Sequence, residues 1–139
     1  MNEALQFELV SPEEKLVSEP VKLAVVPGEE GELGIGAHHA SLVASLKPGV
    51  VALYKENEKE PRKIFIAGGF VDVNGTQCTV LAEEATDLSR LDKAAIEKSI
   101  IDLEEDLKMA AERADQIRIE AKLKMAKAKL SAVTGRIEL

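Results

Sequence analysis

The segment VDVNGTQCTV, residues 71–80, carries the sharpest structural signal in this 139-residue chain. Apolar and polar residues alternate on both sides of Asn74-Gly75. This dipeptide favours a two-residue β-hairpin turn, because such a turn needs a positive φ at both central residues. The segment therefore predicts two short antiparallel strands joined by a tight turn.

The register that we predict for this hairpin places Val73 opposite Thr76 and Val71 opposite Cys78. Cys78 then shares a core-facing side with its valine neighbours. The other side carries polar residues together with Phe70. We interpret Phe70 either as a side chain partly covered by nearby loops or as an interface residue, because isolated exposed apolar side chains are common.

Further strand-length apolar runs lie on both sides of this hairpin and alternate with turn-forming residues. Residues 5–10, 21–26, 41–46, 49–54, 63–73 and 76–82 are rich in Val, Ile, Leu and Phe. The intervening segments, such as SPEE and KENEKEP, have turn composition. Many short strands at close spacing predict an antiparallel β-sandwich or barrel over residues 1–86.

The pattern changes at Asp87, after which neither glycine nor proline occurs until Gly135. We expect Asp87 or Ser89 to cap a first helix. Its apolar residues recur at helical spacing at Ile96, Ile100, Leu103 and Leu107. A second apolar stripe, at Ile119, Leu123, Ala126, Leu130 and Val133, is out of phase with the first. A break near residues 113–115, with Asp115 as a second cap, then makes residues 87–139 an αα-hairpin.

Charge differs between these two predicted helices, since the first is mainly acidic and the second mainly basic. An antiparallel arrangement gives a modest attraction between them. The alternative is that most of these charges lie on solvated faces. Because two helices form almost no core of their own, we expect the hairpin to dock on the β-domain or on a partner.

The composition excludes several classes of protein. The net charge of −7 and an aromatic content of 3% argue against nucleic-acid binding. No apolar run reaches the roughly 20 residues of a membrane span, and the start of the sequence does not resemble a signal peptide. The single cysteine allows no internal disulfide and suggests a reducing compartment. We therefore expect a soluble protein without direct membrane insertion.

Residues 31–42, GELGIGAHHASL, invite a search for a binding site. The spacing of Gly31, Gly34 and Gly36 differs from that of a dinucleotide-binding loop, and we interpret these glycines as shaping a tight strand connection. Adjacent histidines on a strand point to opposite sides, so His38 and His39 are unsuited to chelating one ion. Neither a nucleophile motif nor a catalytic group of residues is evident. We therefore predict a non-enzymatic interaction module without a cofactor or metal.

Three stretches together resemble the epsilon subunit of bacterial F-type ATP synthases, the counterpart of the mitochondrial delta subunit. They are GELGIGAHHASLVASLKPG (31–49), IFIAGGFVDV (64–73) and CTVLAEEA (78–85). The resemblance extends over the whole sequence. It implies an α+β protein with a sandwich of about ten strands over residues 1–86 and a helical hairpin over residues 87–139.

The resemblance also implies a function. Such a subunit is a non-catalytic part of the rotor, which links the gamma subunit to the membrane-embedded c-ring and transmits torque for ATP synthesis coupled to proton transport. Its hairpin can reach the catalytic alpha/beta head transiently and regulate ATP hydrolysis. The implied location is the cytoplasmic face of the bacterial inner membrane. The alternative is a free-standing β-sandwich adapter that docks another partner helix.

The resemblance assigns roles to a few residues. The acidic residue and the histidine of the ring-facing loop match Glu32 and His39, and Phe70 is a candidate for the gamma or hairpin interface. Leu91-Asp92 matches the start of the ATP-binding motif of some relatives, but the arginine of that motif is absent here. Because a guanidinium contributes strongly to phosphate binding, we expect no ATP binding.

Overall fold

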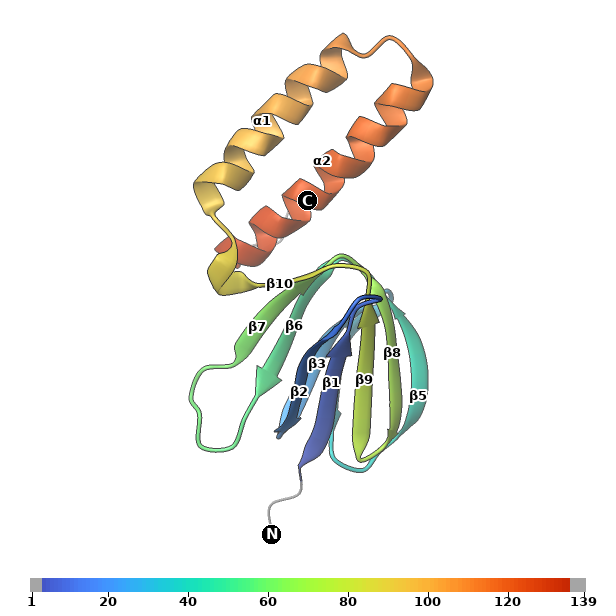
Figure 1. Ribbon diagram of the computed structural model, residues 1–139, viewed down its shortest axis with the longest axis vertical. Coiled ribbons are helices and arrows are strands. Elements are labelled where there is room, and N and C mark those ends of the chain that lie inside the picture. Colours follow the sequence, from blue (N-terminus) through green and yellow to red (C-terminus); the bar gives the residue numbers. More distant parts are fainter. Residues whose placement is uncertain (1–3, 136–139) are drawn as a thin grey trace. The chain divides into compact units, whose positions relative to one another are not determined.

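The computed structural model describes residues 4–135 and divides the protein into two compact units. The first unit ends at Asp87 and the second begins at Leu88. Ten strands build the first unit, and a helical hairpin builds the second (Figure 1). The two units are described separately below.

The strands of the first unit are short, as the alternating apolar runs predict. They are β1 (Leu5–Val10), β2 (Lys15–Val21), β3 (Leu23–Gly28), β4 (Gly31–Gly36), β5 (His39–Leu46), β6 (Gly49–Tyr54), β7 (Arg62–Ile66), β8 (Gly69–Gly75), β9 (Gln77–Ala82) and β10 (Ala85–Asp87). The predicted β-domain with about ten strands is confirmed. The predicted single run over residues 63–73 is wrong, since it divides into β7 and β8 at Ala67-Gly68, and both Gly68 and Gly69 have a positive φ.

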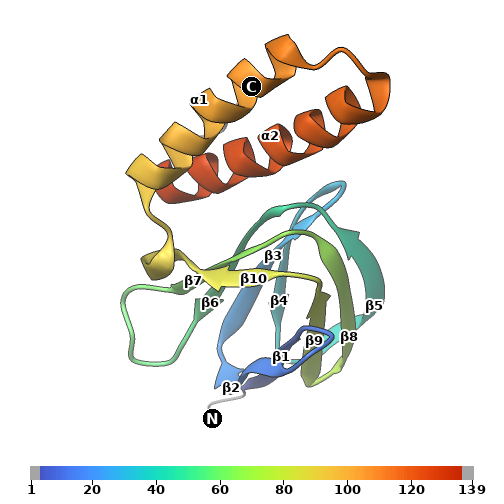
Figure 2. The same ribbon diagram turned by 45° about the horizontal axis from the view of Figure 1, so that its top comes forward.

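The strands follow one hydrogen-bonded path, β10-β7-β6-β3-β5-β8-β9-β1-β2, with β4 paired to β3. Within residues 4–135, β3 and β5 meet at one pair only, Gly28 and Leu46. The path therefore bends into two layers, β4-β3-β6-β7-β10 and β5-β8-β9-β1-β2, which wrap around a common interior (Figure 2). Nearly all pairs are antiparallel. The exception among the described pairs is β1, which lies between β9 and β2 and runs parallel to β9.

The interior of this sandwich is filled by alternate residues of the strands. Leu5, Phe7 and Leu9 of β1 are fully buried, and they contact buried side chains of both layers. The described buried side chains include no polar or charged group. Burial of apolar surface at about 25 cal/mol per Å² is thus the main stabilising contribution in this unit.

The β8–β9 hairpin confirms the predicted faces but not the predicted register. Val73 lies opposite Cys78, and Asn74 lies opposite Gln77, so the turn is Gly75-Thr76, one residue later than expected. Only Gly75 has a positive φ there, of 65°. Because the shift changes each pairing by two residues, the inward and outward faces are unchanged: the valines and Cys78 are buried as predicted.

The second unit contains the 3-10 turn η1 (Leu88–Arg90) and the helices α1 (Lys93–Met109) and α2 (Arg113–Thr134). The αα-hairpin is confirmed, but the predicted caps are wrong. Asp92 caps α1, and α2 begins after Glu112, so Asp115 lies in its first turn. The apolar stripe of each helix is more buried than its other face. Ile96 of α1 and Leu123 of α2 are the most buried isoleucine and leucine of the two helices. Neither helix, within the described residues, is long and apolar enough to cross a membrane.

The charges of the hairpin agree with the alternative interpretation, in which most of them lie on solvated faces. Within residues 88–135 the described ion pairs each join two residues of one helix, as for Lys98 and Asp102 at 3.6 Å. These side chains are more than half exposed. Exposed pairs contribute little to stability, so the helices are held mainly by their apolar stripes.

Gly69 provides a test of the sandwich packing. Its φ is 150°, and a Cβ added there would overlap the carbonyl oxygen of Leu81. We expect Gly69→Ala to lower the free energy of unfolding by about 3 kcal/mol. The matched control is Gly36→Ala, because the nearest atom to an added Cβ there is Lys22 O at 3.8 Å. Equal urea-unfolding midpoints for the two variants would contradict this packing.

Candidate functional site

The turn between β3 and β4 forms the acidic end of an open groove in the first unit. The groove has a volume of about 550 Å³. Its rim carries the carboxylates of Glu29, Glu30 and Glu32, and its apolar lining consists of Leu33, Leu42 and Ala44. Its walls come from the first residues of β4 and from the middle of β5, on either side of the β3–β4 turn.

Glu32 and His39 do not lie together. Glu32 follows the β3–β4 turn directly, whereas His39 begins β5. Only the last residue of that strand, Leu46, returns to Gly28 at the β3–β4 turn. Glu32 and Gly36 lie near the two ends of β4, about 13 Å apart at roughly 3.3 Å per residue, and His39 follows the turn after Gly36. Glu32 and His39 therefore lie on two different strands, β4 and β5.

The three glycines of this region also differ from expectation. Gly31 has a φ of 137° and follows the tight turn, as a loop-shaping glycine should. Gly34 and Gly36 instead lie inside β4, with no positive φ. An added Cβ at either position would meet the nearest atom at 3.8 Å, an ordinary contact. The loop-shaping role predicted for Gly34 and Gly36 is wrong, because this segment is a strand.

The two histidines occupy the turn at the other end of β4 and β5. His38 has a φ of 64°, which is uncommon for a residue other than glycine. The Nδ1 atom of His39 lies 2.7 Å from the carbonyl oxygen of Ala40. Among residues 4–135, no three His, Cys, Asp or Glu side chains are grouped so that they could hold a metal ion.

Phe70 lies on the outward face of β8, as predicted. It is 55% exposed, and its cross-strand neighbour Leu81 is 50% exposed. Val43, on the adjacent strand β5, is 71% exposed and points to the same side, since it pairs with the outward-facing Asp72. Val43, Phe70 and Leu81 form what we call the apolar patch, on the outward face of β5, β8 and β9.

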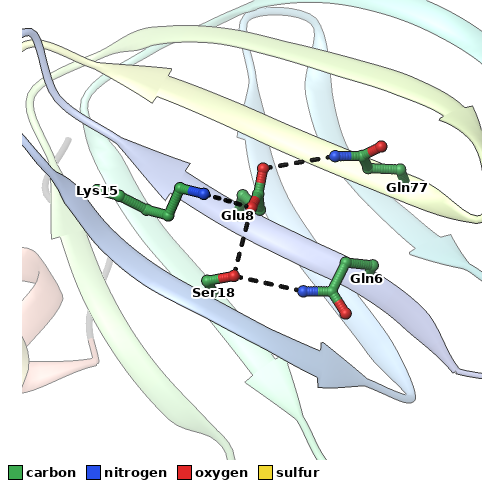
Figure 3. Close-up of polar contacts among 5 residues, drawn as sticks. All are labelled: Gln6, Glu8, Lys15, Ser18 and Gln77. Atoms are coloured by element: carbon green, nitrogen blue, oxygen red, sulfur yellow. Dashed lines mark hydrogen bonds and ion pairs between the residues drawn. The ribbon is translucent and has the colours of Figure 1, made fainter.

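A polar cluster centred on Glu8 lies on the outward face of β1, β2 and β9 (Figure 3). Glu8 Oε2 accepts hydrogen bonds from Lys15 Nζ at 2.9 Å and from Ser18 Oγ at 3.3 Å. Gln77 Nε2 donates to Glu8 Oε1 at 3.4 Å, and Gln6 Nε2 donates to Ser18 Oγ at 3.4 Å. The hydrogen bond from the Lys15 ammonium holds the pKa of the Glu8 carboxyl below its ordinary value.

A series of ion pairs joins the two layers on the side of the sandwich away from β4. Glu19 of β2 lies 2.8 Å from Lys55 Nζ and 3.7 Å from Arg62 Nη1. Arg62 Nε also donates to Asp87 Oδ2 at 3.2 Å, which adds β10 to the series. This side is therefore bridged between the layers, while the β4 side is open.

Asp92 has a structural role in the second unit. Its Oδ1 atom accepts hydrogen bonds from the amides of Ala94 at 3.0 Å and Ala95 at 3.3 Å, as an N-cap does. The amide of Leu91 donates to Leu88 O at 3.1 Å in the preceding turn. The Leu91-Asp92 pair thus starts α1.

Cys78 is fully buried in the first unit, and burial raises the pKa of its thiol to about 12. The thiol therefore stays protonated at neutral pH, and it has the character of a core residue rather than a nucleophile. This agrees with the interpretation drawn from the sequence.

Sequence reasoning missed the Glu8 cluster and the Glu19 ion pairs. Both join residues that are distant in the sequence, such as Glu8 with Gln77 and Glu19 with Arg62. The alternation in β1 does indicate that Glu8 faces outward, but its partners follow only from knowing that β1 lies between β9 and β2.

The sequence and the fold were compared with known families and proteins. Residues 4–87 match the family model for the beta-sandwich domain of the ATP synthase Delta/Epsilon chain, and residues 92–138 match that for the C-terminal domain of the ATP synthase epsilon chain. The ATP synthase epsilon chain of Rhodospirillum centenum is 45% identical over 97% of this protein and 95% of its own length. That of Rhodospirillum rubrum is 42% identical over 97% of this protein and 100% of its own length.

Solved structures with the same fold come from ATP synthases. A subunit of the Euglena gracilis mitochondrial ATP synthase superposes with a TM-score of 0.83 at 25% identity, over 96% of this protein and 83% of that subunit. A subunit from the central stalk and c-ring of the Tetrahymena thermophila mitochondrial enzyme gives 0.61 at 13% identity, over 93% and 96%. The second likeness concerns the fold alone.

The Glu8 cluster makes the stability of the protein depend on pH. Because the folded state lowers the pKa of Glu8, its contribution is fully present above the unfolded pKa and is lost as the pH falls through the folded value. We expect Glu8→Gln to lower the urea-unfolding midpoint at pH 7 and to have a smaller effect near pH 3.

Glu13→Gln, in the exposed turn after β1, is the matched control for this experiment and should change the midpoint little at either pH. A Glu8→Gln effect of the same size at pH 7 and pH 3 would show that the carboxylate charge does not stabilise the fold.

Proposed function

The chain belongs to the ATP synthase epsilon-chain family, and on that basis we propose that it joins the gamma subunit to the c-ring of this enzyme. It is a non-catalytic subunit of the central stalk and turns as part of the rotor. Its partners are the gamma subunit, the c-ring and, through the stalk, the catalytic head. It is a peripheral component of a membrane complex.

One observation carries this proposal: both domain models of the family match this protein, in the order that the family has. A sandwich alone occurs in many unrelated proteins, so the fold by itself would not identify the function. The matches cover residues 4–87 and 92–138, and full-length relatives align over almost the entire sequence.

Different surfaces of the sandwich suit different partners. We assign Glu32 to the c-ring contact, because it is exposed at the β3–β4 turn beside Glu29 and Glu30. The apolar patch around Phe70 suits the gamma subunit, because it offers apolar area on the outward face of β8 and its neighbours. We do not assign His39 to the same contact, because it begins β5 and lies at the other end of that strand from the β3–β4 turn.

The hairpin is the candidate regulatory element. Its helices are paired through a thin apolar stripe, and Ile101, Met109 and Ile117 remain exposed, so a partner could cover them. We propose that it modulates ATP hydrolysis at the head. We also propose that it does so without bound ATP, since Asp92 already caps α1 and the motif arginine is absent.

We further propose that the protein works on the cytoplasmic face of the bacterial inner membrane. The bacterial origin of the two Rhodospirillum relatives supports this location, as does the assembly of the family with a membrane-embedded ring. Its own surface carries a net charge of −7, which gives no attraction to an anionic membrane surface.

Co-purification tests this function. The affinity-tagged protein, expressed with the remaining ATP synthase subunits, should bring down gamma, the c-ring and the head in fixed proportion. Deleting residues 88–139 should leave this assembly intact and change the rate of ATP hydrolysis. Recovery of the tagged protein without gamma would contradict the proposed function.

Glu32→Ala should reduce ATP-driven proton pumping by several-fold while ATP hydrolysis by the assembled enzyme continues. The physical reason is the loss of a charged contact at the ring without any effect on the core, since Glu32 is exposed. Quenching of a pH-sensitive dye in membrane vesicles measures the pumping.

His39→Ala is the control for Glu32→Ala, because it removes a side chain at the other end of the sandwich. A comparable loss of pumping in His39→Ala, or a lower unfolding midpoint in Glu32→Ala, would refute the ring contact assigned to Glu32.

A further inference from the structure

β4 is an edge strand whose outer side has no partner strand among the described residues. It pairs with β3 alone, in a register that places Pro27 opposite Glu32 and Val25 opposite Gly34. The carbonyl of Pro27 accepts from Lys47 N at 2.9 Å, so it points away from β4. Pro27 and Glu32 are therefore a non-hydrogen-bonded pair.

Because hydrogen-bonded and non-hydrogen-bonded pairs alternate, the pair of Val25 and Gly34 has the same character as that of Pro27 and Glu32. The N–H and C=O groups of Glu32, Gly34 and Gly36 then point outward from β3. They form a row of free donors and acceptors, which is the usual template for adding a strand.

The groove begins beside Glu32, at one end of this row. Leu33 and Leu42 contact the core from its two walls and remain partly exposed. An extended segment paired with β4 would point alternate side chains into the groove and cover this apolar surface. The unpaired edge of β4 and the apolar lining of the groove thus both suit an extended peptide.

The glycines of β4 agree with this. Gly34 and Gly36 are not required by the fold, since neither has a positive φ and an added Cβ would meet only ordinary contacts. Glycine inside a strand costs stability and often marks a close approach by another backbone. No such approach to the outer edge occurs within residues 4–135.

We infer that β4 and the groove bind an extended segment of the gamma subunit by strand addition; this inference rests on the proposed function. The side chain opposite Leu33 enters the groove and is apolar. Glu32 lies on the opposite face of β4 from Leu33 and Ile35, so its side chain stays available to the ring.

Gamma is the partner that fits this chemistry. The c-ring spans the membrane, and spanning segments are helices or closed barrels, which leave no free extended strand. The groove is also continuous with the surface assigned to gamma, since β5 carries Leu42 and Ala44 on its groove side and Val43 of the apolar patch on its outer side. The inferred contact is continuous with the ring-facing end of the sandwich at Glu32.

The test compares two variants that each add a valine side chain to the outward face of the same sheet. Val25 lies between Gly34 and Ala52 in one cross-strand row. We expect Gly34→Val to weaken binding of purified gamma at least tenfold, with an unfolding midpoint equal to or above that of the wild type. Ala52→Val, two strands away, should bind gamma as the wild type does.

Amide hydrogen exchange of the wild-type protein provides the second measurement. Addition of gamma should slow exchange at Gly34 and Gly36. Unchanged exchange at both amides, or slowing by the c-ring alone, would overturn the inference. Equal losses of gamma affinity in Gly34→Val and Ala52→Val would also overturn it, because they would show that gamma docks on the face of the sheet. Pairing of β4 with a second copy of this protein would overturn it as well.

The inference and the proposed function fail in different ways. If the wild-type protein does not bind gamma at all, the proposed function fails. If it binds gamma with unchanged affinity after Gly34→Val, only the strand addition fails.

Discussion

The meeting of three strands at Gly28 is the constraint on which the sandwich depends. Gly28 pairs with Gly31 in β4 and with Leu46 in β5, and within residues 4–135 it is the one residue through which β3 pairs with the other layer. A Cβ at this position would lie 2.5 Å from Gly31 O and 3.3 Å from Leu33. Only glycine allows the strands to approach so closely, and this approach turns the strand path into two layers around one core.

The same junction gives the sandwich two unlike sides. On one side, Glu19, Arg62 and Asp87 bridge the layers with ion pairs. On the other side, the layers diverge beyond Gly28, and the groove opens between β4 and β5. A rotor subunit must hold two neighbours rigidly at once, and a dry apolar core with one open side meets this need because it positions each contact surface on a fixed frame.

The sequence predicts the strands and the two-helix hairpin because their apolar periods are strong, as in Leu5–Val10 and from Ile96 to Leu107. The sequence does not predict β4, because Gly34 and Gly36 disfavour a strand. The segment is extended because it pairs with β3. The sequence also does not show that Glu32 and His39 lie on different strands, since β4 and a turn separate them. Tertiary pairing, rather than local preference, decides both points.

The structure of the intact ATP synthase containing this protein tests the account most directly. We predict the sandwich between gamma and the c-ring, with the β3–β4 turn and Glu32 toward the ring and the turn at His38 away from it. Absence of the protein from the central stalk, or a sandwich with the His38 turn against the ring, would contradict the account.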